Sequence, residues 1–470
     1  MNLKKKFETA LQMVSKVNTT GEKDKTSIIV RHVVSSGIIR TCDDTFYLIE
    51  NNLLVPITDR ETHTVIRCLL TDSCKAEVST SVIKEAVERL RDMTEIQIDI
   101  EKIRERNKYR ILLLNGVFDT ESGKFTSQPD SSELFLYCLN FSYISDSTLE
   151  KAPVFNKFAQ TSIGTENLDC LLEWLGYTCT ALVSARKALF LIGTEKCGKS
   201  VLLDVMENAL GSENTSAVPF SKLGTEQSRI KYQGKISNLS RETSAESLKN
   251  DDAFKSLVSG DKITGRYLYE NSKEFVPFAK FTTASNFFPQ FKNMDTATLD
   301  RIIPVYFKDR IESEVPTDYN LKDKLITEKD IIFSMALDRT SGLIKSGYQF
   351  SLPERSDEVL KAKRAELLNV REFITENLEL TADGVISSVA LYQLYTEWCS
   401  INATAPDGRN TFYSKVTDYS SKIKRGKFLI GSRLLNGFKG LKEKCNYKEK
   451  LYGQPYQDSH SSIQKGGEVR

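Results

Sequence analysis

Histidine is scarce in the 470-residue sequence, and its cysteines follow no regular spacing. His32, His63 and His460 are the only three histidines, and the nine cysteines contain no CxxC pair. These features argue against a zinc site of ordinary ligand spacing. They also exclude a disulfide framework, because an odd set of scattered thiols is typical of a reducing cytosol.

Long apolar runs are absent as well. No apolar segment reaches roughly 18 residues, the length that a membrane-spanning helix needs. The basic start MNLKKKFETALQMV is interrupted by Glu8 and Gln12, so no apolar core of a signal peptide forms. We therefore expect a protein of the cytoplasm without a membrane partner.

A bias toward one charge is missing too, because 65 Lys and Arg residues balance 63 Asp and Glu residues. A net charge of +2 neither requires nor excludes a polyanionic partner, so charge must be examined locally. With 40% hydrophobic residues, the composition is that of a globular protein and not of a collagen-like or disordered one. At about 150 residues per domain, the length predicts roughly three domains.

Local patterns predict several secondary-structure elements. Short runs at 26–34 and 45–54 predict strands, and 111–120 predicts a hairpin around Asn115-Gly116. Apolar residues at helical spacing within 155–180 predict helical structure there.

The clearest pattern is a glycine loop at 193–200, GTEKCGKS, which fits GxxxxGKS. The apolar run 188–192 predicts a buried strand before it, and 200–210 predicts an amphipathic helix after it. In this arrangement backbone N–H groups cradle phosphates, Lys199 reaches the β- and γ-phosphates, and Ser200 binds Mg²⁺. The predicted nucleotide-binding residues are Gly193, Thr194, Glu195, Lys196, Cys197, Gly198, Lys199, Ser200 and Val201.

Four further motifs follow the glycine loop in a fixed order. GKISNLSRET at 234–243 predicts a short strand that ends in a carboxylate, about 40 residues after Lys199. The other three are SGDKITGR at 259–266, FVPFAKFTTASN at 275–286 and LDRIIPVYF at 299–307.

This order of motifs resembles the superfamily 3 helicases, specifically the phage, plasmid and poxvirus primase-helicase family. Residues 114–119 and 171–177 are similar to the family's region before the motor. Residues 371–373 and 391–398 are similar to its C-terminal winged-helix module. The resemblance covers about residues 110–450.

The resemblance implies a role for each matching residue. Lys199 and Ser200 would bind the phosphates of ATP and Mg²⁺. Glu242 would orient the attacking water or hold the metal, and Asn286 would sense the γ-phosphate. Arg301 would be an arginine finger that reaches the nucleotide of the neighbouring subunit. Such a cation can stabilise the charge that spreads over the transferred phosphoryl group.

One departure from the family pattern concerns the acidic motif. The acidic motif of the family usually has two carboxylates, whereas here Arg241 precedes Glu242. The second carboxylate is either Glu246, one helical turn later, or absent.

Residues 263–275, ITGRYLYENSKEF, predict a β-hairpin with a polar tip. The resemblance implies that this hairpin projects into the channel of a ring and grips single-stranded DNA. Arg266 and Lys273 would contact phosphates, and Tyr267 or Tyr269 would stack on bases. An ordinary surface hairpin with packed tyrosines would show the same pattern.

Residues 409–450 contain twelve Lys or Arg residues but only three acidic residues. Within them, 412–419 predicts a recognition-type helix, and 426–440 predicts the strands and turn of a wing. This excess of positive charge beside aromatic residues favours duplex DNA, at an origin, over a merely solvated surface. The predicted contacts are Lys422, Lys424, Arg425 and Lys427.

The expected fold is α/β, with an AAA+-like P-loop ATPase core at its centre. The expected parts are an N-terminal α+β docking or collar region (1–110), a helical pre-motor region (111–185), the helicase core (186–350), a winged-helix DNA-binding module (356–450) and a disordered tail (451–470). About 110 residues are too few for a primase catalytic domain as well. Asp99 and Glu101 stand among basic residues, as solvated charges do, so no active primase is expected.

Together these expectations describe an ATP-dependent DNA helicase and replication initiator of a phage or mobile genetic element. It would act in the host cytosol as a homo-oligomeric ring, a hexamer, and move 3′ to 5′ on single-stranded DNA. One alternative is an origin-binding protein whose nucleotide site switches assembly without strong unwinding. The acidic motif supports this alternative, because Arg241 precedes its carboxylate, Glu242. The other is the helicase part of a primase-helicase, which a primer-synthesis assay would test.

Overall fold

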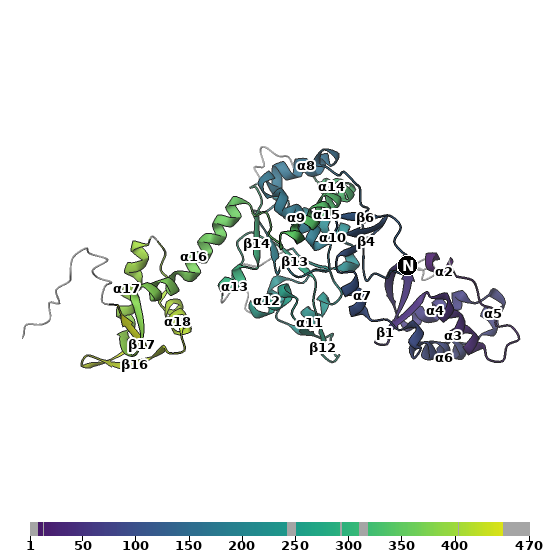
Figure 1. The fold of residues 1–470 in the computed structure, drawn as a ribbon, viewed down its shortest axis with the longest axis horizontal. Coiled ribbons are helices and arrows are strands. Elements are labelled where there is room, and N and C mark those ends of the chain that lie inside the picture. The colour runs from purple at the N-terminus through teal and green to yellow at the C-terminus, as the bar shows by residue number, and fades with distance from the viewer. Residues whose placement is uncertain are drawn as a thin grey trace, which may run out of the picture. The chain divides into compact units, whose positions relative to one another are not determined.

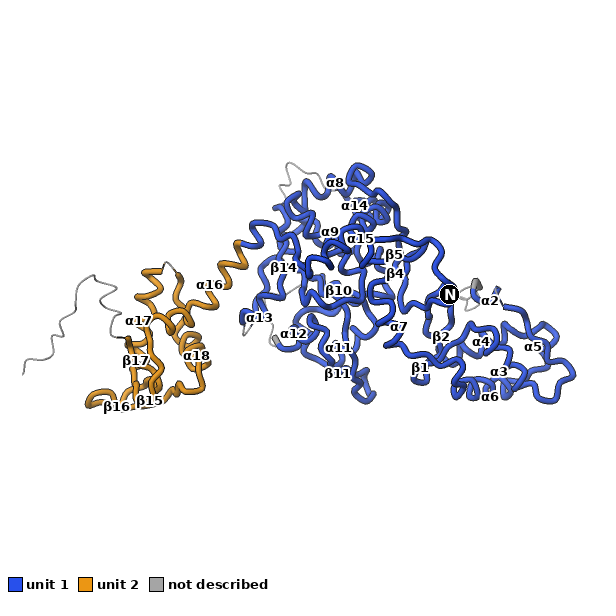
Figure 2. The backbone as a smooth tube through the Cα atoms, viewed as in Figure 1, with its two compact units in different colours: residues 1–357 blue, residues 358–470 orange. Residues whose placement is uncertain are grey.

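The structure is a computed structural model that forms two compact units, residues 1–357 and residues 358–470 (Figure 2). Its mixture of helices and sheets confirms the predicted α/β class (Figure 1). No helix in the described part of the chain is both long and apolar enough to cross a lipid bilayer. The structure describes residues 8–12, 14–241, 251–291, 294–309, 318–402 and 404–444.

The first part of unit 1 packs helices against a three-stranded antiparallel sheet of order β1-β2-β3. Both turns of this sheet contain residue pairs with positive φ, Asp43-Asp44 and Asn51-Asn52, as tight hairpin turns require. The elements are α2 Glu8–Gln12, α3 Lys25–Ser36, β1 Ile39–Cys42, β2 Thr45–Glu50, β3 Leu53–Ile57, α4 Asp59–Leu69, α5 Asp72–Glu77, α6 Thr80–Arg91, η1 Thr94–Ile96 and α7 Ile100–Arg106.

The strand predicted at 26–34 is wrong, because these residues belong to helix α3. Within this β-branched run, Ile29, Val30 and Val33 are spaced so that they form one buried face of a helix. The Asp24 side chain caps the helix by accepting a hydrogen bond from the Ser27 amide at 3.0 Å. Tertiary packing of this face outweighs the β preference of the individual residues.

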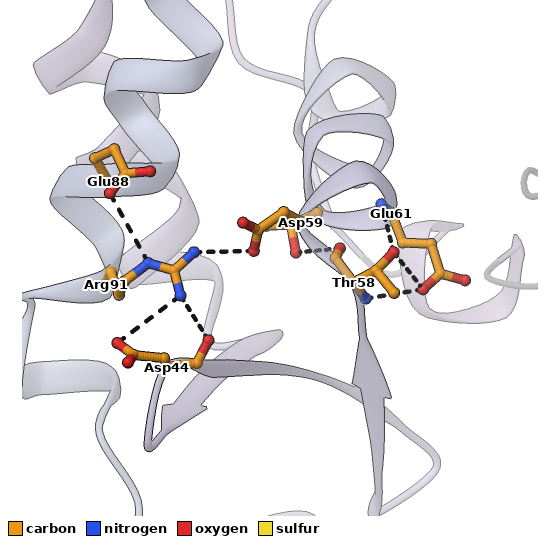
Figure 3. A network of polar contacts seen from close by, with 7 residues as sticks. Asp44, Thr58, Asp59, Glu61, Glu88 and Arg91 are labelled. Carbon is orange, nitrogen blue, oxygen red and sulfur yellow. Dashed lines mark hydrogen bonds and ion pairs between the residues drawn. The ribbon is translucent and has the colours of Figure 1, made fainter. Parts of the chain in front are cut away.

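Arg91, the last residue of α6, links three elements of this first part (Figure 3). Its guanidinium donates to the Asp44 carbonyl at 2.6 Å and pairs with the Asp59 carboxylate at 2.9 Å. It also lies 5.1 Å from the centre of the Phe46 ring. The turn between β1 and β2, the start of α4 and the end of α6 are therefore held together by one side chain.

A four-stranded sheet of order β6-β5-β4-β7 and a helical segment follow. The predicted hairpin at 111–120 is confirmed, since β4 and β5 pair antiparallel. The elements are β4 Arg110–Leu113, β5 Gly116–Asp119, β6 Lys124–Thr126, β7 Cys138–Leu139, η2 Leu149–Lys151, α8 Pro153–Phe158, η3 Ala159–Ile163, η4 Thr165–Asn167 and α9 Leu168–Thr178.

The centre of unit 1 is a five-stranded sheet of order β14-β8-β13-β10-β9, in which every pair is parallel. Its elements are β8 Ala188–Ile192, α10 Lys199–Leu210, η5 Ser212–Asn214, β9 Thr215–Ser216, η6 Phe220–Lys222, α11 Glu226–Arg229, η7 Ile230–Tyr232, β10 Ser237–Ser240, α12 Asp251–Ser259, β11 Ile263–Gly265, β12 Lys273–Phe275, β13 Lys280–Ser285, α13 Thr296–Leu299, β14 Ile302–Tyr306, α14 Leu321–Thr327 and α15 Lys329–Lys345.

Alternate residues of β8 belong to different hydrophobic clusters. Leu189 and Leu191 pack into the cluster that contains α9, α10 and α15, whereas Phe190 packs among phenylalanines of the other cluster. A strand covered on both faces reads as a continuous apolar run, which is why 188–192 shows no alternation.

Unit 2 has a three-stranded antiparallel sheet of order β15-β17-β16, packed against helices. The rings of Tyr395 and Phe412 stack in its core, with centroids 4.2 Å apart. Its elements are the end of α16 Glu354–Asn377, β15 Leu378–Ser387, α17 Ser388–Ile401, α18 Arg409–Tyr419, β16 Lys424–Ile430 and β17 Arg433–Glu443. The predicted tail at 451–470 lies outside the described residues.

Helix α9 connects the central sheet to α15. The Trp174 indole donates a buried hydrogen bond to the Thr282 hydroxyl on β13 at 2.9 Å. Two residues later, a Cβ on Gly176 would lie 2.3 Å from the Ala336 carbonyl oxygen and 2.3 Å from the Thr340 hydroxyl. Glycine is therefore required where α9 and α15 cross.

We predict that Gly176→Ala lowers the free energy of unfolding of unit 1 by ~1–3 kcal/mol, because the added methyl group pushes α9 away from α15. The matched control is Gly342→Ala in α15, where an added Cβ would meet nothing within 4 Å. That control is expected to be neutral or to stabilise by up to ~1 kcal/mol. Urea midpoints measure both effects, and equal midpoints for Gly176→Ala and the wild type would contradict the packing argument.

Candidate nucleotide-binding site

The candidate site lies where parallel strands β8 and β13 end. Ile192 pairs with Ser285, so the glycine loop that follows β8 starts beside Asn286, which follows β13. The Gly193 amide donates to the Ser285 carbonyl at 3.2 Å and fixes the first loop residue to the neighbouring strand. Ligands of open parallel sheets bind at this carboxyl edge of the strands.

The glycine loop folds back closely on itself. A Cβ on Gly193 would lie 2.9 Å from the Cys197 sulfur, and Lys196 has a positive φ of 59°. Gly198 has φ +102°, and a Cβ there would lie 2.6 Å from the Phe158 ring. The two glycines of the pattern are therefore required by close contacts, and the second also by its backbone conformation.

Lys199 is nearly buried, and its ammonium group points back into the loop. It donates to the carbonyl oxygens of Gly193 and Thr194, each at 2.6 Å. It also donates to the Asn286 side-chain oxygen at 3.3 Å. Two residues that come from separate motifs thus meet at one point of the site.

The start of α10 faces the same loop. Gly198 is its N-cap and has no side chain that could satisfy the first amide groups of the helix. These N–H groups and the helix dipole favour an anion at this end. Ser200 is exposed in the first turn of the helix, so its hydroxyl is accessible to a bound ion.

Glu242, the predicted acidic residue, lies outside the described residues, as does Glu246. The adjacent Arg241 is described and turns toward α10. It pairs with the Asp204 carboxylate at 2.6 Å and also with Glu207. This pairing of Arg241 with α10 was not predicted from the sequence. The only signal was the spacing of Asp204 and Glu207, which places both carboxylates on one face of α10.

Arg301 lies at the opposite end of the parallel strands, where β8 and β14 begin. It immediately precedes β14, whose first residue Ile302 pairs with Ala188 at the start of β8. The four residue steps along β8 separate it from the glycine loop by about 13 Å. Its guanidinium donates to the Ser259 hydroxyl at 3.0 Å and to the Ala297 carbonyl at 2.6 Å. The structure therefore does not bring Arg301 to the Lys199 of the same chain.

The predicted hairpin at 263–275 is present, as antiparallel strands β11 and β12. Tyr267 and Tyr269 are exposed at its tip, Tyr269 by 97%. Arg266 is ion-paired with Glu226 at 3.3 Å, whereas Lys273 is exposed and 3.9 Å from Glu270. The chain passes from β12 directly into the start of β13. The base of the hairpin is therefore close to the end of the strands where Arg301 lies.

The four predicted DNA contacts of unit 2 lie around strand β16. Lys422, Lys424 and Lys427 are exposed. The Arg425 guanidinium lies 4.7 Å from the centre of the Tyr413 ring on α18, which holds the arginine against the helix.

Lys280 belongs to the motif at 275–286, but its burial was not predicted from the sequence. Its ammonium group is fully buried, donates to the Thr180 and Phe278 carbonyls and lies 5.6 Å from the centre of the Tyr177 ring. Burial lowers the pKa of Lys280 to about 7, and the nearby Cys179 thiol opposes this shift only in part.

Comparisons with known proteins give partial matches. Residues 27–164 match a family described as D5 N terminal like, and residues 191–301 match a family of unknown function, DUF5906. No curated protein matches the chain. The D5-like match fits the predicted relation to phage primase-helicases, and it begins well before residue 110, where the sequence resemblance began.

Two solved structures align with most of this chain. One is the apo structure of the NrS-1 C-terminal region (305–718), with 11% identity, coverage of 89% of this chain and 100% of that chain, and a TM-score of 0.48. The other is the A form apo structure of the same region, with 12% identity, coverage of 88% and 98%, and a TM-score of 0.46.

We predict that the buried Lys280 amine makes stability depend on pH. Between about pH 7 and the ordinary lysine value of 10.5, the unfolded chain binds one proton more than the folded chain. Stability therefore rises with pH across this window, by up to about tenfold in the folding equilibrium constant per pH unit.

Urea midpoints measured between about pH 7 and 10 test this expectation against Lys280→Met, which lacks the titrating group. The wild type is expected to gain stability relative to Lys280→Met as the pH rises. Lys262→Met, which removes an exposed lysine that pairs with Glu274, is the matched control and is expected to follow the wild type. Parallel curves for the wild type and Lys280→Met would contradict the prediction.

Proposed function

We propose that this protein is an ATP-dependent DNA helicase and replication initiator of a phage or mobile genetic element. The proposal rests above all on the meeting of Lys199 and Asn286 at the carboxyl edge of a parallel sheet. A loop of this kind followed by a helix binds phosphates, and a polar residue on the next strand is placed to report on the last phosphate.

The order β14-β8-β13-β10-β9, with the glycine loop after the second strand of this order, supports an AAA+-like ATPase core. The residues present fit ATP. The glycine loop has no room for a side chain at Gly198, and no side chain caps the start of α10. Ser200 and Glu242 would hold Mg²⁺, which neutralises charge on the β- and γ-phosphates.

In this proposal Lys199 exchanges the two loop carbonyls for phosphate oxygens. Both carbonyls belong to the glycine loop, so the ammonium group is already directed into the loop that would hold the phosphates. Asn286 contacts the γ-phosphate, and Glu242 orients the attacking water. Preorganised donors of this kind stabilise charge that develops during phosphoryl transfer.

Arg301 acts on the nucleotide of a neighbouring subunit, because it cannot reach the site of its own chain. A residue on one edge of the sheet and a nucleotide on the other edge are brought together when copies join head to tail, and such contacts close into rings. We propose a hexamer, in which hydrolysis at each interface depends on the subunit beside it.

Two DNA contacts complete the proposal. The exposed tyrosines of the β11–β12 hairpin and the nearby Arg266 and Lys273 would grip single-stranded DNA in the ring channel. The order α16, β15, α17, α18, β16, β17 with the sheet order β15-β17-β16 supports a winged helix in unit 2. Its basic strand β16 and the preceding Lys422 would contact duplex origin DNA.

One observation favours a second candidate function, a nucleotide-dependent switch at an origin. Arg241 occupies a position where the related motifs have a carboxylate, and its guanidinium forms ion pairs with Asp204 and Glu207. A site with a single acid would hydrolyse ATP slowly. The single-turnover rate of ATP hydrolysis separates the two candidates, because a motor must turn over many times during unwinding.

We predict that Lys199→Ala reduces ATP turnover at least about a hundredfold, because the cation that binds the β- and γ-phosphates is lost. Asn286→Ala should lower turnover while nucleotide binding is retained. Lys196→Ala is the matched control, since this exposed loop residue contributes a backbone amide that alanine keeps. Unchanged turnover in Lys199→Ala would contradict the assignment of the site.

We predict that Arg301→Ala reduces turnover by ~10³-fold and that mixing restores part of it. In a 1:1 mixture with Lys199→Ala, about a quarter of the interfaces combine an intact Lys199 with an intact Arg301. Activity should therefore reappear in the mixture although each variant alone is inactive.

Ser259→Ala is the control for a purely structural role, because it removes the hydroxyl to which Arg301 donates. If Arg301 served only its own chain, Ser259→Ala would lower turnover as well and mixing would restore nothing.

A further inference from the structure

The hairpin of β16 and β17 extends beyond the rest of its sheet. The third strand, β15, pairs with β17 only from Gly437 onward. Residues 427–430 and 433–436 pair solely with each other, around a turn at Gly431, which has φ +63°. The end of this hairpin, residues 427–436, is therefore a two-stranded ribbon, which we call the wing tip.

The wing tip carries an exposed pair of leucines. Leu429 and Leu434 lie directly opposite each other and share one face, with 69% and 65% of their surfaces exposed. Among the described residues, neither belongs to a hydrophobic cluster. Exposed apolar side chains that lie together and are rimmed by polar residues are a candidate interaction site.

The opposite face of the wing tip is less exposed, because Phe428 and Ile430 pack within the hairpin, although Leu435 on that face is 40% exposed. Gly426 and Gly437 lie opposite each other and leave space on that face. The Phe428 ring lies 3.4 Å from the Cβ position of Gly426, and Ile430 lies 3.3 Å from that of Gly437. The fold thus covers these two residues but leaves the leucine pair uncovered.

Positive charge lies near the leucine pair on both faces of the hairpin. Lys424, Lys427 and Arg433 are exposed, and none of them has a carboxylate partner within the described part of unit 2. Lys427 lies on the same face as the leucines, two residues closer to the sheet, whereas Lys424 and Arg433 lie on the opposite face. A polyanion that also offers an apolar interior complements such a surface, and duplex DNA has phosphates outside and stacked bases inside.

We infer that Leu429 and Leu434 form a wedge that enters the minor groove of duplex DNA and opens a base step. Lys427, beside the leucines, and Lys424 and Arg433, on the opposite face of the hairpin, hold the phosphates on either side of the groove. This inference rests on the proposed function, because it assumes that unit 2 binds duplex DNA. Apolar side chains inserted in this way unstack bases and bend the duplex. Pyrimidine–purine steps such as TA open most easily, so the wedge favours sites that contain them.

Two leucines are too small an apolar surface for stable attachment to a membrane, which scales with the buried apolar area. DNA needs no such area, because the flanking cations supply most of the affinity and the wedge acts on one base step. The chemistry of the wing tip therefore favours duplex DNA over a lipid surface.

The test uses the full-length protein and a duplex with 2-aminopurine beside a central TA step, whose fluorescence rises when the base is unstacked. The wild type should raise the fluorescence several-fold on binding. Leu429→Ser with Leu434→Ser should bind the duplex within about threefold of the wild type but leave the fluorescence low. Leu380→Ser is the matched control, because this exposed leucine pairs with Leu441, away from the wing tip.

A second variant separates the wedge from the binding itself. Replacing Lys424, Lys427 and Arg433 by Gln should weaken binding and reduce the slope of log affinity against log salt by about 0.9 per lost phosphate contact. Wild-type binding without a rise in fluorescence would overturn the wedge and leave the DNA-binding function intact. Absence of duplex binding by the wild type would overturn both.

Two further outcomes would also overturn the wedge. If only the leucine substitutions abolish sedimentation with phosphatidylserine vesicles, the wing tip is a lipid contact. If they change the oligomeric state without DNA, it is a contact between copies. The wedge predicts neither effect.

Discussion

The parallel pairing of β8 with β13 determines where the candidate site lies. Because Ile192 is level with Ser285, the residues that follow the two strands emerge side by side. The Lys199 ammonium group can then contact the Asn286 side chain across the gap, although 87 positions separate them in the sequence. A shift of this register by one residue would reverse the direction of every side chain on β13 and separate the two groups. The buried bond from Trp174 to Thr282 and the close crossing of α9 with α15 hold β13 in this register.

The same sheet separates the chemistry of one subunit into two edges. The glycine loop and Asn286 lie at the carboxyl ends of the strands, whereas Arg301 and the tyrosine hairpin adjoin the other end. In the proposed function, this arrangement would give oligomerisation a physical reason, since the site would be completed by an arginine from a neighbouring chain. The hairpin lies at the same end of the strands as Arg301, so in the proposed ring it would be close to the nucleotide of the neighbouring subunit.

Local patterns in the sequence predicted the elements around the glycine loop, because each rests on neighbouring residues. The strand at 188–192 and the helix after it are both present, the helix as Lys199–Leu210. Features that depend on distant packing were not predictable in this way. The β-branched run at 26–34 is a helix because a buried face decides its conformation, and Lys280 is buried because α9 and the loop after it cover the start of β13. The ion pairs of Arg241 with α10 likewise join residues that only the fold brings together.

The central claim is that ATP hydrolysis at this site drives strand separation. The most direct measurement is the release of a labelled strand from a forked duplex by the purified protein with ATP and Mg²⁺, with forks that carry a single-stranded tail at either the 3′ or the 5′ end. The account predicts release from the fork with the 3′ tail and none with ADP. Binding and hydrolysis of ATP without strand release from either fork would contradict the claim and favour a nucleotide-dependent switch.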